Sequence, residues 1–321
     1  MAGLRAVFGA ALMLGASCTL APADNYPAQA VRILIAANAG SPADLTARVL
    51  GRRLNQKFNQ PFWMENRPGT GAEGAAAIVA RAPKDGYTLL MGTAANTIRN
   101  SVAVDPALNF TTDLAPIVLI ASVPQILVVT PTLGVDNVRE LIALAKAHPG
   151  ELSFGSSGSG SATELSGELF NKMAEVRILR VPYSGISPAV TDLLAGRISA
   201  MFAPASAVLQ YVDQGRLKAL ATTGGKRAAI ASTLPTMTEA GVPGFETGLW
   251  FGLLAPAGTP EEAIQRIGDA VNEALQAHEI RSALRVQGID PVGGSPNDFA
   301  RHIESETRKW SGIAATVGLK K

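Results

Sequence analysis

The sequence predicts an α/β protein with two domains, each a mostly parallel β-sheet flanked by helices. Short apolar runs alternate along the chain with segments whose apolar residues recur at helical spacing. Repeated βα units of this kind form parallel sheets covered by helices on both faces. The chain has 321 residues, of which 47% are hydrophobic and 17% charged, so it can bury two cores of ordinary size.

The first residues predict a secretory signal peptide. Arg5 supplies a positive charge, and residues 7–15 are apolar but too few for a permanent membrane anchor. Ala21 and Ala23 are small residues at the two specificity positions of a signal-peptidase site, so we expect cleavage after Ala23 and export to the periplasm. The alternative is lipoprotein anchoring at Cys18, although Leu14 lies one position too far upstream for a good lipobox.

The mature chain excludes several classes of function. Cleavage removes Cys18, the single cysteine, so neither a disulfide nor thiol chemistry is expected. Basic and acidic residues nearly balance, and no basic run stands out, so we expect no nucleic-acid partner.

The first βα series begins with residues 31–36, a run that is apolar apart from Arg32 and typical of a strand buried on both faces. Apolar residues from Leu45 to Phe58 then recur at helical spacing. A strand at 61–65, a helix at 72–81 and a strand at 87–91 complete this series.

A second series and a helical tail follow. The second series is predicted to contain helices at 138–147, 163–173, 188–195 and 205–213 and strands at 152–154, 178–181, 199–203 and 217–222. The tail is predicted to contain a strand at 250–255 and helices at 260–276, 280–287 and 296–315.

The long apolar run at 117–129, interrupted at Pro124, can carry the chain between the domains, and residues 243–249 can carry it back. Periodicity alone does not fix these crossings, and the family resemblance described below helps to place them. We expect a signal peptide at 1–23, a first domain at 24–124 and 246–321, and a second at 125–245. Two crossings make a hinge.

Two loops share a design suited to anions. After the first strand, Ser41 is a good N-cap, Pro42 suits the first helical position, and Asp44 completes a capping box. In the Gly- and Ser-rich loop at 155–164, Ser161 and Glu164 repeat the box. Each loop offers backbone N–H groups and a positive helix end at the carboxyl edge of a parallel sheet, where α/β folds bind ligands.

Purely structural interpretations compete with a ligand-binding role for these motifs. Capping boxes are mostly structural, and the same pattern at 259–262 and 295–298 is interpreted only as the start of a helix. The glycines and serines of the second loop exceed what a cap requires, which favours a function there. Residues 69–74 match the dinucleotide fingerprint, but no acidic residue ends the next strand, so a packed turn is the better interpretation.

Signals for an enzyme are poor. His148, His278 and His302 do not cluster with carboxylates or a cysteine at metal-ligand spacing, and residues 155–161 contain no nucleophile elbow. We therefore expect no catalysis, no metal and no cofactor.

The chain resembles the substrate-binding family of tripartite tricarboxylate transporters, the Bug family. The resemblance covers nearly all of the mature chain, from Tyr26 to the last predicted helix, and the segments that carry it are residues 65–69, 85–90, 156–158, 167–170, 181–183 and 250–260. The resemblance implies a Venus-flytrap, type II-like periplasmic-binding-protein fold. It also implies capture of a small organic carboxylate in the interdomain cleft, largely by main-chain N–H groups and water, and delivery to a two-subunit membrane permease. We expect a monomer.

The candidate ligand-binding residues follow from the two loops and the resemblance. They are Ala37, Asn38, Gly40, Ser41, Asp44, Thr93, Ser157, Gly158, Ser159, Gly160, Ser161, Tyr183 and Ala203. The chain departs from the family pattern at Ala37, where an aromatic is typical, and at Ala203, where an aspartate is frequent. These departures predict a roomier, more apolar pocket and a bulky or aromatic carboxylic acid. Gly158→Val is expected to abolish binding with little loss of stability.

Two other functions remain open at this level. A sensor subunit that presents its ligand to a membrane receptor or kinase could have the same sequence. An enzyme on the same scaffold is disfavoured because no catalytic constellation is evident.

Overall fold

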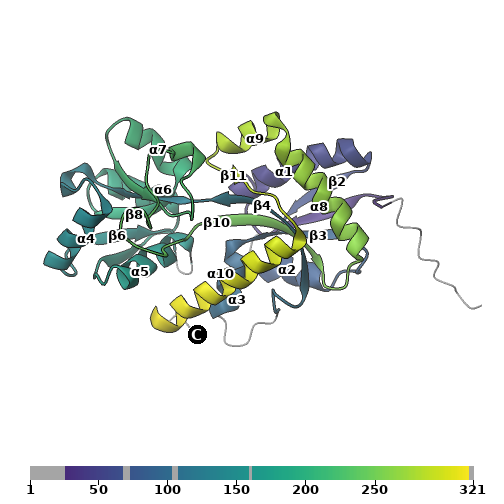
Figure 1. The fold of residues 1–321 in the computed structure, drawn as a ribbon, viewed down its shortest axis with the longest axis horizontal. Helices are drawn as coiled ribbons and strands as arrows, with labels where there is room; N and C mark the ends of the chain where they lie inside the picture. Colours follow the sequence, from purple (N-terminus) through teal and green to yellow (C-terminus); the bar gives the residue numbers. More distant parts are fainter. Residues whose placement is uncertain (1–25, 68–72, 103–107, 159–160, 318–321) are drawn as a thin grey trace, which may run out of the picture.

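The computed structural model describes residues 26–67, 73–102, 108–158 and 161–317, which form two lobes, each built on one sheet (Figure 1). The first sheet has the strand order β11-β4-β10-β3-β1-β2 and the second β7-β6-β8-β5-β9. The first contains β1 (Val31–Ile35), β2 (Phe62–Asn66), β3 (Thr88–Thr93), β4 (Leu114–Val123), β10 (Leu249–Pro256) and β11 (Asp290–Pro291). The second contains β5 (Gln125–Val129), β6 (Ser153–Ser156), β7 (Leu179–Pro182), β8 (Ala200–Pro204) and β9 (Lys218–Thr222).

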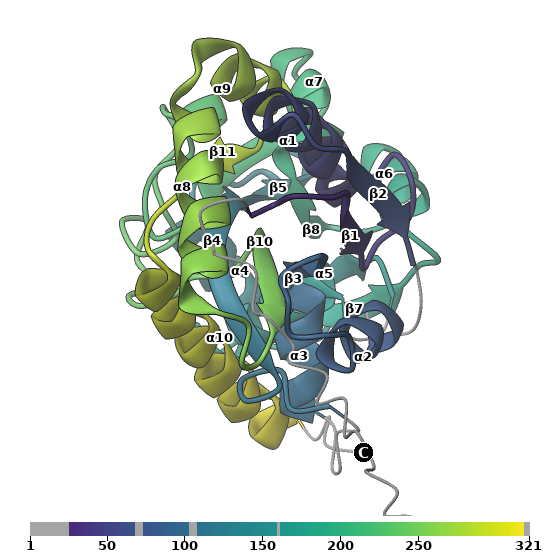
Figure 2. The same ribbon diagram turned by 90° about the vertical axis from the view of Figure 1, so that its right-hand side faces the viewer.

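Helices cover both faces of each sheet, which confirms the predicted fold class (Figure 2). The first lobe carries α1 (Pro42–Phe58), α2 (Glu73–Ala80), α3 (Ala94–Val102), α8 (Glu261–Gln276), α9 (His278–Arg285) and α10 (Pro296–Val317). The second carries α4 (Val138–Ala147), α5 (Ala162–Met173), α6 (Ile186–Leu194), α7 (Ala205–Asp213) and the short 3-10 helices η3 (Pro131–Leu133) and η4 (Ala229–Ala231). Among the described helices, none combines the length and apolar composition that a membrane span requires.

Burial on both faces explains the continuous apolar runs of the sequence. In β1, Leu34 packs with α2, α3 and α10, whereas Ile33 and Ile35 pack with α1 and α8 on the opposite face. In β8, Phe202 likewise faces α4 and α5, and Met201 faces α6 and α7. Because both faces of these strands are covered, nearly all their residues are apolar; Arg32 of β1, whose side chain is 41% exposed, is the exception.

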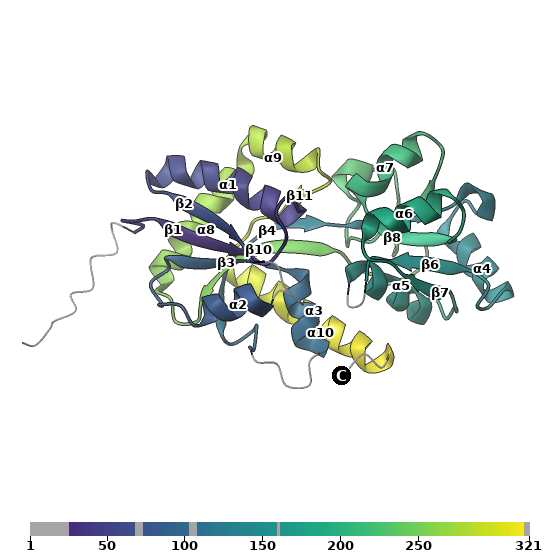
Figure 3. The ribbon, with the colours of Figure 1, turned by 180° about the vertical axis from the view of Figure 1, so that it is seen from behind.

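Strand direction brings the functional loops together. β4 and β5 follow one another through Pro124 and carry the chain from one lobe to the other (Figures 1 and 3). The pairings orient β1, β2 and β3 like β4, so that these strands run toward the second lobe. β6, β7 and β8 run opposite to β5 and hence back toward the first lobe. The loops that follow β1, β3, β6, β7 and β8 therefore converge between the lobes.

The elements that were not predicted include α3, β11 and the two 3-10 helices. α3 was not predicted because its buried residues include the polar Asn96, Thr97 and Ser101, so its buried face shows no apolar pattern in the sequence. Ser101 Oγ instead lies 3.1 Å from the Thr307 carbonyl of α10. β11 has only two residues and pairs with β4, which no local pattern could indicate.

Gly167→Ala tests how tightly α5 packs on its sheet. A Cβ at Gly167 would lie 2.1 Å from Cε2 of Phe154, which is 2% exposed. We expect the free energy of unfolding to fall by about 1–3 kcal/mol in urea denaturation, because overpacking outweighs the better helix propensity of alanine.

Gly74→Ala in α2 is the matched control, because no described atom lies within 4 Å of its Cβ position. This exposed helical substitution should stabilise the protein by about 0.5–1 kcal/mol. A Gly167→Ala protein as stable as the Gly74→Ala protein would contradict the packing described.

Candidate ligand-binding site

The loop after β1 is held by the carboxylate of Asp44. Ser41 is the N-cap of α1, and its Oγ accepts from Asp44 N–H at 3.3 Å. The Asp44 carboxylate, 2% exposed, accepts from Gly40 N–H at 2.9 Å, one residue before the position that a capping box uses. Arg48 Nε and Asn66 Nδ2 also donate to it at 2.9 Å. Asp44 therefore shapes the loop and has little surface for a ligand.

The charge of Asp44 is stabilised in place. Burial by itself would raise the pKa of Asp44, but the hydrogen bonds from Arg48, Gly40 and Asn66 outweigh burial and hold the pKa below its ordinary value. Asn66 also donates to the Ala37 carbonyl at 3.2 Å, which ties the loop to β2.

The outer part of this loop is open. Asn38 and Gly40 are exposed, and Ala37 and Ser41 are half-buried. Gly40 has φ +77°, a conformation that glycine adopts without strain. Ser41 N–H donates to the Asn38 carbonyl at 3.2 Å. No described residue accepts from Ala43 N–H, so this helical donor is left for a ligand or water.

Thr163 organises the second loop, although the sequence did not single it out. Its Oγ1 accepts from Ser157 N–H at 2.7 Å and lies 3.0 Å from Ser157 Oγ and 2.9 Å from Ser161 Oγ. Ser161 caps α5 by accepting from Glu164 N–H at 3.3 Å. No described residue accepts from the N–H groups of Ala162 and Thr163. The predicted site residues Ser159 and Gly160 lie outside the described residues.

The predicted capping box at Ser161 is only half formed. The Ser161 N–H donates to the Gly158 carbonyl at 3.2 Å, and the Glu164 side chain, 1% exposed, forms an ion pair with Arg180 of β7. The box at 295–298, interpreted as structural, is complete: Asp298 N–H donates to Ser295 Oγ at 3.1 Å and Ser295 N–H to Asp298 Oδ2 at 2.9 Å.

The prediction that Thr259 caps α8 is wrong. Thr259 Oγ1 donates to the Pro256 carbonyl at 2.8 Å, and the helix starts after Pro260 without a side-chain cap.

Gly158 has φ +123°, and among the described atoms a Cβ there would meet the Tyr183 carbonyl oxygen alone, at 3.6 Å. A valine would be strained in this conformation, so the expectation that Gly158→Val spares stability is wrong. That substitution cannot separate a binding defect from a folding defect.

Two other predicted site residues, Thr93 and Tyr183, make hydrogen bonds within the fold. Thr93 ends β3, is 7% exposed, and is fixed by a 2.9 Å bond from its N–H to Asn96 Oδ1. Asn96 belongs to the unpredicted α3, so sequence reasoning missed it. Tyr183 donates its hydroxyl to Asp192 at 2.8 Å, and burial together with this bond raises the pKa of Tyr183 to about 12.

Ala203 has no exposed surface and packs among Ile126, Val190 and Val208. Ala203 therefore opens no space between the lobes, and the prediction of a roomier pocket rests on Ala37 alone. Ser156, at the end of β6, is also fully buried, and its Oγ has no hydrogen-bond partner among the described residues.

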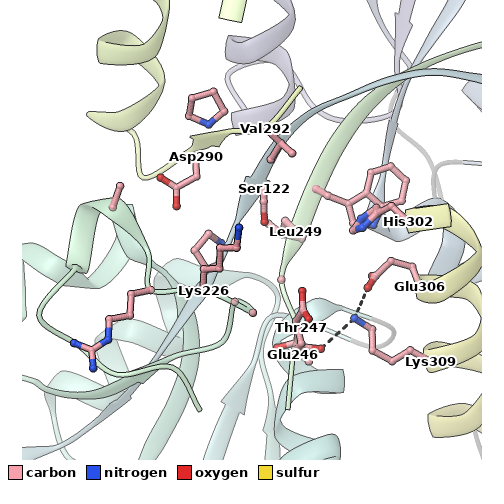
Figure 4. Close-up of a pocket in the computed structure, with 18 of the residues that line it drawn as sticks. Ser122, Lys226, Glu246, Thr247, Leu249, Asp290, Val292, His302, Glu306 and Lys309 are labelled. Carbon is pink, nitrogen blue, oxygen red and sulfur yellow. Dashed lines mark hydrogen bonds and ion pairs between the residues drawn. The ribbon is translucent and has the colours of Figure 1, made fainter. Parts of the chain in front are cut away.

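A cavity of about 750 Å³ lies elsewhere, between β11, α10 and the crossing segments (Figure 4). Lys226, Arg227, Arg285 and Lys309 line it together with Glu246, Asp290 and Glu306. None of the loop residues above lines it. Arg227 is paired with Glu239 and Lys309 with Glu306, so little of its positive charge is left for an anion. Within the described parts of the chain, no group of three His, Cys, Asp or Glu residues could hold a metal ion.

Comparisons with known proteins agree on one family. The model of the tripartite tricarboxylate transporter family receptor (TctC) matches residues 46–319. Protein BugT of Bordetella pertussis (strain Tohama I) is 34% identical over 322 residues, covering 100% of this chain and 99% of BugT.

Solved structures give the same picture. R. palustris Rpa4515 with adipate is 38% identical with a TM-score of 0.76, covering 91% of this chain and 98% of that one. MatC (Rpa3494) from Rhodopseudomonas palustris with bound malate is 28% identical with a TM-score of 0.73, covering 90% and 99%. The periplasmic binding protein BugD is 28% identical with a TM-score of 0.74, covering 92% and 100%.

Asp44→Ala tests the loop geometry. Removing the carboxylate takes away the acceptor of Gly40 N–H, one of the two acceptors of the Asn66 amide and the charge partner of Arg48, so we expect the free energy of unfolding in urea to fall by about 1–3 kcal/mol at pH 7. The pKa of Asp44 is lowered on folding, so its contribution is full above the unfolded value of about 4 and is lost as the pH falls through the folded value. The difference from wild type should shrink as the pH is lowered below about 4.

Asp44→Asn is the control, because it keeps an acceptor for Gly40 N–H but has no charge to titrate. A stability difference between Asp44→Ala and wild type that did not change with pH would contradict a role for the charge.

Proposed function

Because the chain belongs to the tripartite tricarboxylate transporter receptor family, we propose that it binds a small organic carboxylate between its lobes and delivers it to a membrane permease. The observation that carries the proposal is the convergence of two capped helix N-termini, at Ser41 and Ser161, on the space between two sheet edges. Such ends attract anions through their free N–H groups and the helix dipole.

The nearby arginines favour main-chain recognition. Arg48 is paired with Asp44, and Arg180 with Glu164, so neither guanidinium is a free cation for the ligand. The N–H groups of Ala43, Ala162 and Thr163 remain as donors. Selectivity then depends on where these donors lie more than on the identity of side chains.

Two helix ends suit a ligand with two acceptor groups. The R. palustris relative was solved with adipate and MatC with malate, both dicarboxylates. The loop after β1 adds the apolar side chain of Ala37. We therefore propose a carboxylate with an apolar body, first an aliphatic dicarboxylate like adipate and second an aromatic acid.

The remaining parts of the proposal concern processing and motion. We propose that residues 1–23 are a cleaved signal peptide, that the protein acts as a monomer in the periplasm, and that its domains are 24–124 with 246–321 and 125–245. Ligand contacts from both lobes would favour a closed form only through a higher affinity for that form.

A thermal-shift screen tests the ligand class. Adipate, malate, benzoate and aspartate would each be added to the purified protein at millimolar concentration. Adipate at a hundred times its Kd should add about 2.7 kcal/mol, which corresponds to a rise in Tm of roughly 5 °C or more. Stabilisation by aspartate alone would contradict an apolar-bodied ligand, and no response to any carboxylate would contradict carboxylate binding.

Ala162→Pro tests the main-chain donor at α5. Proline at the first helical position removes one N–H but preserves the helix, and the extended conformation of Ser161 (ψ 154°) suits a following proline. Loss of one hydrogen bond to a charged group, about 1.5–3 kcal/mol, should weaken binding by roughly 10- to 100-fold in calorimetry with the best ligand of the screen.

Ala162→Ser keeps the N–H and should bind nearly as wild type. Undiminished affinity of a folded Ala162→Pro protein would exclude this N–H from the site.

A further inference from the structure

The sheet of the first lobe pairs with the two crossing segments up to one pair of residues, beyond which the long Lys309 side chain of α10 donates to the Glu246 carbonyl at 3.0 Å. Val123 of β4 and Leu249 of β10 are register partners at the end of the first sheet. Toward the second lobe, the next residues along the two segments are Pro124 and Gly248, and they lie in no strand. The first sheet therefore holds each segment only as far as this pair.

Beyond Pro124 and Gly248, the segments are fixed to the second lobe through Thr223. Thr223 N–H donates to the Gln125 carbonyl at 2.9 Å, and Gln125 N–H donates to Thr223 Oγ1 at 2.9 Å. Thr247 N–H donates to the Thr223 carbonyl at 2.9 Å, and Thr223 Oγ1 donates to the Thr247 carbonyl at 2.8 Å. Gln125, Thr223 and Thr247 are all buried, so water does not compete for these bonds.

Ser166 joins this cluster to the helix that begins at the second loop. It lies on α5, is fully buried, and its Oγ is 2.5 Å from Gln125 Oε1 and 2.8 Å from Thr247 Oγ1. One hydroxyl thus contacts both crossing segments. Through it, α5 and the proposed ligand donors at its start are tied to the hinge.

The two crossing segments leave no room for a side chain at Gly248. A Cβ at Gly248 would lie 3.2 Å from the Val123 carbonyl oxygen and 3.6 Å from Pro124 Cα, a contact with main chain that cannot rotate away. Proline fixes φ in one segment, whereas glycine leaves the other segment free to rotate.

We propose that relative rotation of the lobes is confined to Pro124 and Gly248, and that Ser166 is the positioning residue that makes α5 move as one body with Gln125 and Thr247. The inference rests on the proposed function only in that ligand binding would drive the rotation. The cavity between β11, α10 and these segments is lined by Pro124, Thr247 and Gly248, so its volume should change as the pivot turns.

Distances between spin labels test the pivot without any ligand. Labels would be attached at Arg52→Cys in α1 and Ala143→Cys in α4, both exposed positions, in a chain that also carries Cys18→Ser. We expect Gly248→Ala to narrow the distribution of inter-lobe distances, because its methyl group meets the Val123 carbonyl. Pro124→Gly should broaden it, because φ is no longer fixed.

Gly74→Ala is the matched control and should leave the distribution unchanged, since no described atom lies near its Cβ position. Ser166→Ala should broaden the distribution in a protein that still unfolds cooperatively, whereas Ser166→Thr, which keeps the hydroxyl, should retain the wild-type width.

Wild-type widths for both Gly248→Ala and Pro124→Gly would overturn the pivot, and a wild-type width for Ser166→Ala would overturn the positioning role. A second measurement separates this inference from the proposed function. Adipate should shift the mean distance of the wild-type protein, and failure to do so would count against adipate binding while the ligand-free widths still decide the pivot.

Discussion

The rest of this structure depends on one constraint, the direction of the parallel strands relative to the chain that crosses between the lobes. β1, β2 and β3 run with β4 toward the second lobe, whereas β6, β7 and β8 run against β5 and back toward the first. In each lobe the carboxyl ends of the parallel strands therefore face the other lobe. Loops that are more than a hundred residues apart in the chain can then present their helix N-termini to one shared space, which is where α/β folds bind ligands.

The electrostatics of the two loops follow a common plan. Each helix carries an acidic residue in its first turn, and each acid is buried and paired with an arginine, Asp44 with Arg48 and Glu164 with Arg180. A buried, unpaired carboxylate would repel an anionic ligand and would be costly to desolvate. Pairing removes both problems and leaves the main-chain N–H groups as the anion-attracting feature.

Local patterns predicted most elements because burial on both faces leaves a continuous apolar signal, as in β1 and β8. α3 was not predicted because its buried residues include the polar Asn96, Thr97 and Ser101, which make hydrogen bonds within the fold and give no apolar pattern in the sequence. The capping boxes show the limit most clearly. Four segments share one spacing, and of these the box at Ser295 closes fully. Thr259 instead donates to the Pro256 carbonyl, Asp44 accepts from Asn66, and Glu164 pairs with Arg180.

The sequence by itself determined the α/β class, the two βα series, the serine caps of α1 and α5, and the family, since these depend on composition, periodicity and short motifs. Only the tertiary structure decided that Asp44 shapes its loop, that Ala203 is buried in a core, and that Thr163, Asn96 and Ser156 lie at the meeting edges. It alone brought Gln125, Ser166, Thr223 and Thr247 into one cluster. The physical reason is that a hydrogen-bond partner is chosen by proximity in the folded chain, which spacing along the sequence does not encode.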